Sequence, residues 1–364
     1  CNVPHLRFPE FTEEWVNVSL KDVADFQKER ISSGLLDEST YISTENILQN
    51  FQGVQSAISI PANTNVVAYK KNDILLSNIR PYLKKAWFSD RIGGCSADVF
   101  VLRSKTCEPE FLYNVIASDK FINYVMSGAK GVKMPRDKNQ MESFSFSIPA
   151  VVEQRKISRL FQLLDERIVT QNKIIEDLKK LKSAISERLL KGVKGSTVLL
   201  SDICDIVKGK QINGENLSES GNYYVMNGGT ELSGYYDDYN VEANTISISE
   251  GGNSCGYVQF NTSPFWSGGH CYSIQDITDN VDNLYLYHYL KSKEDAIMKL
   301  RIGSGLPNIQ KKDLAMFKIK IPAVEQQLKI STFLSSLERK AEIEERIQNA
   351  LLKEKQYLLH QMFI

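Results

Sequence analysis

The sequence lacks the long apolar runs that a membrane-spanning helix needs, because its apolar stretches are only a few residues long. Its opening segment, residues 1–10, mixes polar side chains with two prolines, so we expect no secretory leader there and predict a cytoplasmic protein. None of the six cysteines forms a C-x-x-C pair, and their scatter favours reduced thiols over a disulfide framework.

The chain has no net charge, since 44 basic side chains balance 44 acidic ones. A protein that binds nucleic acid non-specifically is usually basic, so this balance argues against that class. Basic residues do gather at 148–192, a stretch with 10 Lys and Arg against 6 Asp and Glu. Any contact with DNA would therefore have to come from local patches, or be shared with a basic partner protein.

The motifs of several enzyme classes are missing. There is no G-x-x-x-x-G-K-[ST] sequence for nucleotide hydrolysis and no G-x-G-x-x-G after a predicted strand. Asn-Ile-Arg-Pro-Tyr at 78–82 lacks the first proline of the Asn-Pro-Pro-Tyr motif of adenine methyltransferases. Four histidines indicate no catalytic triad, and no second pair completes a zinc site beside His270 and Cys271. We therefore predict no catalytic residue, no metal site and no cofactor bound by this chain.

An internal repeat is the strongest feature that the sequence does contain. Ile-Pro-Ala-Val-Val-Glu-Gln-Arg-Lys-Ile at 148–157 returns as Ile-Pro-Ala-Val-Glu-Gln-Gln-Leu-Lys-Ile at 321–330, at an offset of 173. The starts of the two halves, at 18–25 and 198–205, are similar as well. Between these anchors the halves diverge almost completely. This pattern predicts a duplicated pair of domains that does one job on two different targets.

A helical pattern follows each repeated segment. Proline and an early glutamate, Pro149 and Glu153, suit a first helical turn. Apolar residues then recur in alternating steps of four and three, a heptad-like pattern that Gln171 and Lys182 interrupt. We call this row the seam: it comprises Ile157, Phe161, Leu164, Ile168, Ile175, Leu178 and Ile185 in the first helix, and Ile330, Leu334, Leu337, Ile347, Leu351 and Leu358 in the second.

Each predicted helix has about 40 residues and a length of roughly 60 Å. A lone helix with such an apolar stripe would be poorly soluble, so it needs a partner. One alternative is that each helix packs on its own domain. We favour an antiparallel coiled coil within the chain, because the two seams match in length and phase. That pairing would place the two globular domains at opposite ends with pseudo-twofold symmetry.

Both globular halves have the pattern of a mixed α/β (α+β) fold. Residues 99–102 and 245–248 are typical of short strands, and amphipathic helices are predicted at 110–127 and 283–295. The boundaries that follow are a first domain at 1–147, a helix at 148–192, a second domain at 193–321 and a second helix at 322–364.

The candidate DNA-binding residues lie in loops of both domains. Arginine can read guanine, asparagine can read adenine, and lysine neutralises phosphate. The candidates of the first domain are Asn78, Arg80, Tyr82, Lys84, Lys85, Lys130, Lys133, Arg136 and Lys138. Those of the second are Lys208, Lys210, Gln211, Asn253, Tyr257, His270, Arg301 and Asn308. Solvated surface loops explain the first set equally well, and the glycines around the second set equally well serve tight turns.

Taken together, the sequence resembles the specificity subunit of type I restriction–modification enzymes. The resemblance rests on the paired Ile-Pro segments at 148–157 and 321–330 with their long helices. It also rests on Pro-x-Leu-Arg-Phe-Pro-Glu-Phe at 4–11, on Trp15 and on Asn-Ile-Arg-Pro-Tyr at 78–82. The likeness covers nearly the whole chain.

The resemblance implies that each globular half is a target-recognition domain that reads one half of a split, asymmetric DNA sequence. The two helices would fix the unread spacer and, with the domain flanks, dock two methyltransferase subunits. Up to two restriction subunits would then join. S-adenosylmethionine, ATP and Mg would be used by those partners, and this chain would be non-catalytic. The competing interpretation is a coiled-coil adaptor that joins two proteins and ignores DNA; an autonomous methyltransferase or nuclease is disfavoured by the missing motifs.

Overall fold

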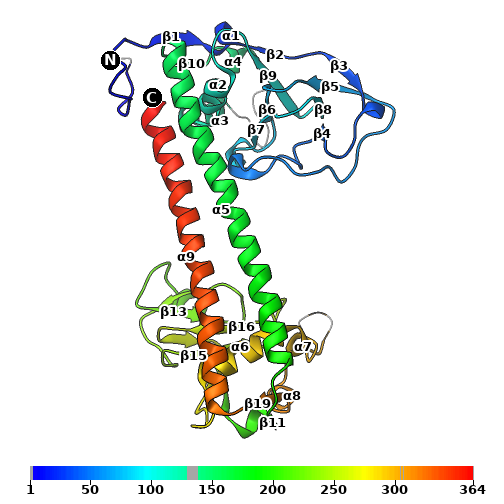
Figure 1. Cartoon of the computed structure of the whole chain (residues 1–364), viewed down its shortest axis with the longest axis vertical. Helices are drawn as coiled ribbons and strands as arrows, with labels where there is room; N and C mark the ends of the chain where they lie inside the picture. The colour runs from blue at the N-terminus through cyan, green and yellow to red at the C-terminus, as the bar shows by residue number, and fades with distance from the viewer. Residues whose placement is uncertain (1–2, 129–137, 304, 306, 364) are drawn as a thin grey trace. The chain divides into compact units, whose positions relative to one another are not determined.

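The computed structural model describes residues 3–128, 138–303, 305 and 307–363 (Figure 1). The chain forms two compact units, Cys1–Asn172 with Ile347–Ile364, and Lys173–Arg346. Each unit contains one globular domain and segments of two long helices, α5 (Val151–Lys191) and α9 (Val324–Met362). These helices lie within the predicted ranges 148–192 and 322–364.

The first domain is built on two four-stranded sheets. The first sheet is antiparallel, in the order β2 (Ala24–Phe26), β9 (Val99–Ser104), β6 (Ile74–Ser77), β7 (Ala86–Phe88). The second has the order β3 (Arg30–Ser32), β5 (Asn65–Tyr69), β8 (Gly93–Cys95), β4 (Tyr41–Ile42), with β4 parallel to β8. A separate antiparallel pair, β1 (Val16–Ser19) with β10 (Ser145–Ile148), joins the start of the domain to its end.

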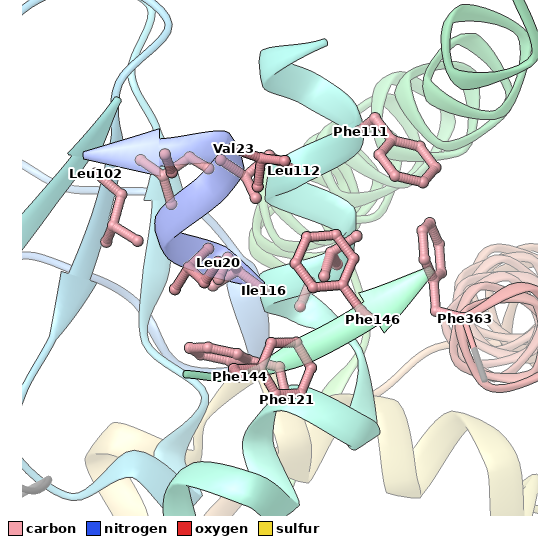
Figure 2. Packing of buried hydrophobic residues seen from close by; sticks show 14 of the residues in the cluster. Leu20, Val23, Leu102, Phe111, Leu112, Ile116, Phe121, Phe144, Phe146 and Phe363 are labelled. Carbon is pink, nitrogen blue, oxygen red and sulfur yellow. The ribbon is translucent and has the colours of Figure 1, made fainter. Parts of the chain in front are cut away.

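Short helices cover one sheet of this domain and build its core. They are α1 (Leu20–Val23), α2 (Pro109–Ala117), α3 (Asp119–Gly128) and α4 (Lys138–Glu142), and three 3-10 turns lie in loops: η1 (Ser33–Leu35), η2 (Gln49–Phe51) and η3 (Pro81–Leu83). Phe111, Leu112 and Ile116 of α2 are fully buried (Figure 2). The end of α9 enters the same core, because the ring of Phe363 lies 5.4 Å from that of Phe111 and 5.9 Å from that of Phe161 on α5.

The second domain repeats this plan with different loops. Its larger sheet is antiparallel, in the order β12 (Asp205–Lys208), β18 (Cys271–Gln275), β15 (Thr245–Ser249), β16 (Val258–Asn261). Its smaller sheet has the order β14 (Gly234–Tyr236), β13 (Tyr223–Met226), β17 (Phe265–Ser267). The closing pair is β11 (Ser196–Leu199) with β19 (Lys318–Ile321), and the helices are η4 (Leu200–Asp202), η5 (Gly214–Asn216), α6 (Asn283–Ser292), α7 (Glu294–Met298) and α8 (Lys311–Ala315).

The internal repeat extends to individual core positions. Tyr285, Leu286 and Leu290 of α6 are fully buried, as are the corresponding Phe111, Leu112 and Ile116 of α2. The predicted mixed α/β fold with an internal repeat is confirmed.

The prediction of a single helix at 110–127 is wrong. Ser118 takes extended backbone angles and ends α2, and α3 begins one residue later. The Ser118 hydroxyl donates to the Val115 carbonyl and accepts from the Phe121 amide, so one side chain satisfies backbone groups on both sides of the break. The amphipathic period continues through the break, which is why the pattern alone did not reveal it.

The two long helices run antiparallel in each unit. In the first unit, Asp165 and Asn172 of α5 pair with Lys355 and Gln348 of α9, so the residue numbers rise on one helix as they fall on the other. In the second unit, Lys182 of α5 bonds to Glu338 of α9 in the same sense. The predicted antiparallel pairing is therefore confirmed.

The seam is buried most deeply where each helix leaves its own domain. Ile157 and Phe161 belong to the core of the first domain, and Ile330 and Leu334 to that of the second. Both interpretations of the seam thus apply, each to a different part of a helix. The other seam residues fall into three groups: Ile168 and Ile175 are buried, Leu164, Leu178, Ile185, Leu337, Leu351 and Leu358 are half-buried, and Ile347 is 37% exposed.

Two further observations concern the described residues only. No helix among them is long and apolar enough to cross a membrane. The five described cysteines are free, buried thiols, and burial raises the pKa of Cys95 and of Cys204 to about 12, which makes both weak nucleophiles.

A buried histidine in the second unit makes stability depend on pH. His288 of α6 is 3% exposed, its Nε2 lies 2.9 Å from the Ser335 hydroxyl, and burial lowers its pKa to about 4. The folded state thus binds fewer protons than the unfolded state between these two pKa values, 6.5 and about 4. This contribution is complete above pH 6.5 and is lost as the pH falls toward 4.

We expect the free energy of unfolding to fall by about 3 kcal/mol over this interval. His288→Asn should flatten the dependence, because the equivalent position of α2 already holds a buried asparagine, Asn114. Urea denaturation of the full chain across the interval is the measurement, with the exposed His360→Asn as the control. An equal slope in His288→Asn and the parent chain would refute the assignment.

Candidate nucleic-acid interface

In the first domain, the loop after β6 presents two candidate side chains to solvent. Pro81 is buried at the start of η3, whereas Arg80 is exposed and Tyr82 is 56% exposed. Arg80 has a φ of 51°, in the left-handed region that residues other than glycine rarely adopt. Such a conformation persists only where the surroundings enforce it, and it is frequent at functional sites. The loop is therefore a candidate site that presents an arginine and a tyrosine to solvent.

The neighbouring candidates hold this loop in place. The Lys84 ammonium lies 2.9 Å from the Asp119 carboxylate at the start of α3, and that of Lys85 donates to the Thr44 carbonyl over 2.7 Å. Asn78 is half-buried, and its side-chain oxygen is enclosed without a hydrogen-bond partner among the described residues. These three side chains are less available to a ligand than Arg80 and Tyr82.

The second basic patch of this domain is only partly described. The Lys138 ammonium lies 5.1 Å from the ring centre of Phe26 and 5.3 Å from that of Phe100. Burial lowers its pKa, which fits an ammonium group packed against aromatic rings. The remaining candidates of the patch lie outside the described residues: Lys130, Lys133 and Arg136.

In the second domain, the Glu250 carboxylate contacts two of the candidate DNA-binding residues. Glu250 accepts from Lys208 over 2.6 Å and from the Tyr272 hydroxyl over 3.2 Å, and its second oxygen lies 3.6 Å from His270 Nδ1. The Glu250 side chain is 10% exposed, but those of Lys208 and His270 are 53% and 62% exposed. Glu250 therefore orients a cation and an imidazole that both face solvent. The sequence offered one signal for it, since Glu250 is the only acidic residue in the glycine-rich loop 249–257.

Two loops meet beside this carboxylate. The Glu250 carbonyl accepts from the Ile309 amide over 2.8 Å, and Gly251 forms a β-bridge with Asn308. These contacts bring the exposed Asn308 next to the group of Lys208, Glu250 and His270. Asn253 and Arg301 are exposed on the same two loops.

The last candidates of this domain are divided between the surface and internal packing. Lys210 and Gln211 are exposed, and the Gln211 side chain packs over Gly269, where a Cβ would lie 2.4 Å from its Oε1. Tyr257 does not join the surface group, because the Lys291 ammonium covers its ring at 4.0 Å.

A glutamine of the repeat fastens each domain to its long helix. Gln154 donates to the Pro149 carbonyl and accepts from the Glu108 amide at the start of α2, over 2.8 and 2.9 Å. In the second unit, Gln327 donates to the Pro322 and Asn280 carbonyls, over 2.8 and 2.9 Å.

Gln327 also accepts from the Asp282 amide at the start of α6, over 2.8 Å. Both glutamine side chains are buried. The sequence showed these residues as matched positions of the repeat but gave no sign of their bonding.

The described part of the chain contains no group of three or more His, Cys, Asp and Glu side chains placed to hold a metal ion. The candidate surfaces consist of cations, amides, a tyrosine ring and the Glu250 carboxylate with its imidazole neighbour, and their cations and amides are suited to phosphate and base contacts.

Comparison with known proteins identifies the family. A model of the type I restriction modification DNA specificity domain matches residues 12–180 and again residues 193–353. The two matches cover most of the chain, one in each half, and the chain belongs to this family.

Curated relatives carry the same description. A type I specificity subunit of Mycoplasma pneumoniae is 31% identical over 145 residues, which make up 39% of this chain and 38% of that protein. One of Mycoplasma genitalium is 32% identical over 121 residues, 33% of this chain and 31% of that protein. Both matches thus span well under half of the relative. The MjaVIII specificity subunit of Methanocaldococcus jannaschii is 24% identical over 409 residues, which cover 98% of this chain and 92% of that protein.

Solved structures share the fold. The S subunit of a type I restriction–modification system from M. genitalium has a TM-score of 0.71 at 17% identity, covering 100% of this chain and 99% of that one. A chain from a structural study of type I complex assembly has a TM-score of 0.59 at 18% identity, with 95% and 96% covered. The curated relatives are named as specificity subunits of type I systems, and the predicted membership of this chain in that family is confirmed.

The glutamine contacts lead to a test of the attachment between domain and helix. Gln327→Ala removes one acceptor and two hydrogen bonds to carbonyls from a buried position, so we expect it to destabilise the chain by about 2–3 kcal/mol. Its neighbour Gln326 is exposed, and Gln326→Ala is the matched control. Denaturant unfolding measures both, and equal stabilities would exclude a role of Gln327 in the attachment.

Proposed function

We propose that this specificity subunit reads a bipartite, asymmetric DNA target, with one domain for each half-site. The supporting observation is the double family match, one in each half, combined with two different sets of exposed cations and amides on a common frame. The two domains share the same arrangement of sheets and helices but have different loops. They are therefore suited to the same task on different base sequences.

The base-contacting surfaces in this proposal are the two exposed groups. In the first domain, Arg80 reads a guanine or a phosphate and Tyr82 packs against the sugar–phosphate backbone. In the second domain, Lys208 and His270 approach the DNA on either side of Glu250, and Asn308 offers an amide to a base edge. A chain with no net charge then depends on these local groups and on its partners for phosphate contact.

The long helices dock the methyltransferase subunits in this proposal. Each carries exposed apolar side chains on the surface away from the seam: Val152, Leu163, Val169, Ile174 and Leu181 on α5, and Val324, Leu328, Phe333 and Ile343 on α9. Exposed apolar residues at such density favour a protein partner over solvent. Restriction subunits join the same complex. S-adenosylmethionine, ATP and Mg are used by those partners, and the complex acts on DNA in the cytoplasm.

The paired helices act as a ruler in this proposal. They link the two domains through a fixed length of helix, and that length sets the number of unread base pairs between the half-sites. The number of heptads in the helices therefore determines the DNA target as directly as the recognition loops do.

Exchange of one domain tests the division of labour. Replacing residues 15–147 by the corresponding domain of another specificity subunit should change one half of the methylated sequence and leave the other half and the spacer unchanged. Sequencing of methylated adenines in cells that carry the complex gives the result. A change in both halves, or in neither, would contradict the proposal, and failure of the complex to bind DNA even at low salt would favour the adaptor interpretation.

A point substitution tests the Arg80 surface. Arg80→Ala should weaken DNA binding by the assembled complex by about 1–3 kcal/mol, with relaxed specificity only in the half-site of the first domain. Lys71 is an exposed cation at the other end of β6, and Lys71→Ala is the matched control. Electrophoretic mobility shift of both variants on matched and mismatched half-sites is the measurement. Equal losses in the two variants would reduce Arg80 to a general contribution of charge.

A further inference from the structure

Two ion pairs between the long helices occupy equivalent positions of the repeat. In the first unit the Lys355 ammonium lies 2.5 Å from the Asp165 carboxylate, and in the second that of Lys182 lies 2.5 Å from the Glu338 carboxylate. Lys182 and Lys355 are 173 positions apart, as are Asp165 and Glu338, the offset of the whole repeat. Each helix thus supplies one lysine and one carboxylate, and the two contacts have the same geometry.

Both lysines are withdrawn from solvent. The Lys355 side chain is 10% exposed and that of Lys182 is 25% exposed, although both lie on helices with long solvent-facing surfaces. An ammonium group withdrawn from solvent in this way favours the register that places it opposite a carboxylate, because an unpaired buried charge is destabilising. A register shifted by one heptad would separate both lysines from their partners at once.

A tyrosine of the adjoining domain lies beside each pair. The Tyr287 hydroxyl of α6 donates to the Glu338 carboxylate over 3.1 Å. The equivalent Tyr113 of α2 lines one groove with Asp165 and Lys355, and burial together with the Asp165 charge raises its pKa. In the second unit the Glu338 carboxylate thus contacts both the opposite helix and the adjoining domain.

A third ion pair provides the contrast. Lys179 lies 2.6 Å from Glu345 and its side chain is 62% exposed, so the contrast lies in the lysine; the Glu345 and Asp165 side chains are exposed alike, at 42% and 41%. At the repeat offset these positions hold Leu352 and Asn172, so this pair has no counterpart in the first unit. Exposed pairs contribute little to stability. Lys179 with Glu345 is thus the natural control for the two enclosed pairs.

We propose that Asp165–Lys355 and Lys182–Glu338 fix the antiparallel register of α5 and α9, and are thereby positioning residues for the spacer of the DNA target. The link to the spacer rests on the ruler of the proposed function, whereas the control of register does not. The pairs act by excluding other registers, as single polar residues do in the cores of coiled coils.

The test replaces both enclosed pairs by apolar residues: Asp165→Leu, Lys355→Met, Lys182→Met and Glu338→Leu in one chain. Such replacements are often neutral or stabilising, so the helices are expected to stay folded. They lose the charge pairing that distinguishes one alignment of the two helices from another. The control chain carries Lys179→Met and Glu345→Leu. A second variant exchanges the charges of both enclosed pairs, Asp165→Lys with Lys355→Asp and Lys182→Glu with Glu338→Lys, and keeps every charge in the seam.

Disulfide cross-linking reads the register without DNA. Asn172→Cys with Gln348→Cys joins two side chains that touch across the helices, and Asn172→Cys with Ala341→Cys reports a displacement by one heptad. In the parent, control and charge-exchanged chains only the first link should form. In the apolar chain its yield should fall about tenfold relative to the displaced link. Circular dichroism of each chain records the helix content.

The methylated sequence gives the second readout. The apolar chain should methylate sites with more than one spacer length, and the charge-exchanged chain should keep the parent spacer. A native link at full yield in the apolar chain would overturn the proposal, as would loss of helix in the charge-exchanged chain with an unaffected control. If the register shifts while the spacer stays single, the ruler of the proposed function fails and the control of register stands.

Discussion

The rest of the structure depends on the burial of an apolar stripe along two helices of 41 and 39 residues. Neither helix has a sequence that is stable alone in water, so each must find apolar surface along its whole length. The first turns find it in the core of their own domain, where Phe161 and Leu334 are almost fully buried. The middle turns find it in the opposite helix, and the last turns find it in a globular domain again, since Leu359 and Leu190 belong to the cores of the first and second domain. A domain that loses its helix would therefore lose part of its own core.

Much of this arrangement follows from local patterns. The seam, the entry into each helix and the strands at 99–104 and 245–249 are visible because periodicity and proline position act over short distances. The repeat added a second, independent instance of each pattern. The break at Ser118 was not visible, since a serine that serves both neighbouring helices leaves the apolar period intact.

The sequence did not show which of the candidate cations are engaged within the fold, for a physical reason. Residue type shows that Lys84 and Arg80 are cations, but their availability depends on residues far away in the sequence. Asp119 lies 35 positions from Lys84 and binds it. Glu250 lies 42 positions from Lys208 and orients it. Such pairings arise from the fold. A search of the sequence for cations in loops therefore finds both side chains that face solvent and side chains that are already paired with another residue.

The contacts that join domain and helix explain how the domains can diverge without losing their place. Gln154 and Gln327 bond to backbone atoms, the carbonyl of a proline and the first amide of a short helix, and not to side chains of the recognition loops. A backbone partner is present whatever the loop sequence is, so substitutions in the loops leave the attachment intact. The same holds for the β1–β10 and β11–β19 pairs, which are held by main-chain hydrogen bonds. The recognition loops can therefore change their sequence while the contacts that hold each domain on its helix stay the same.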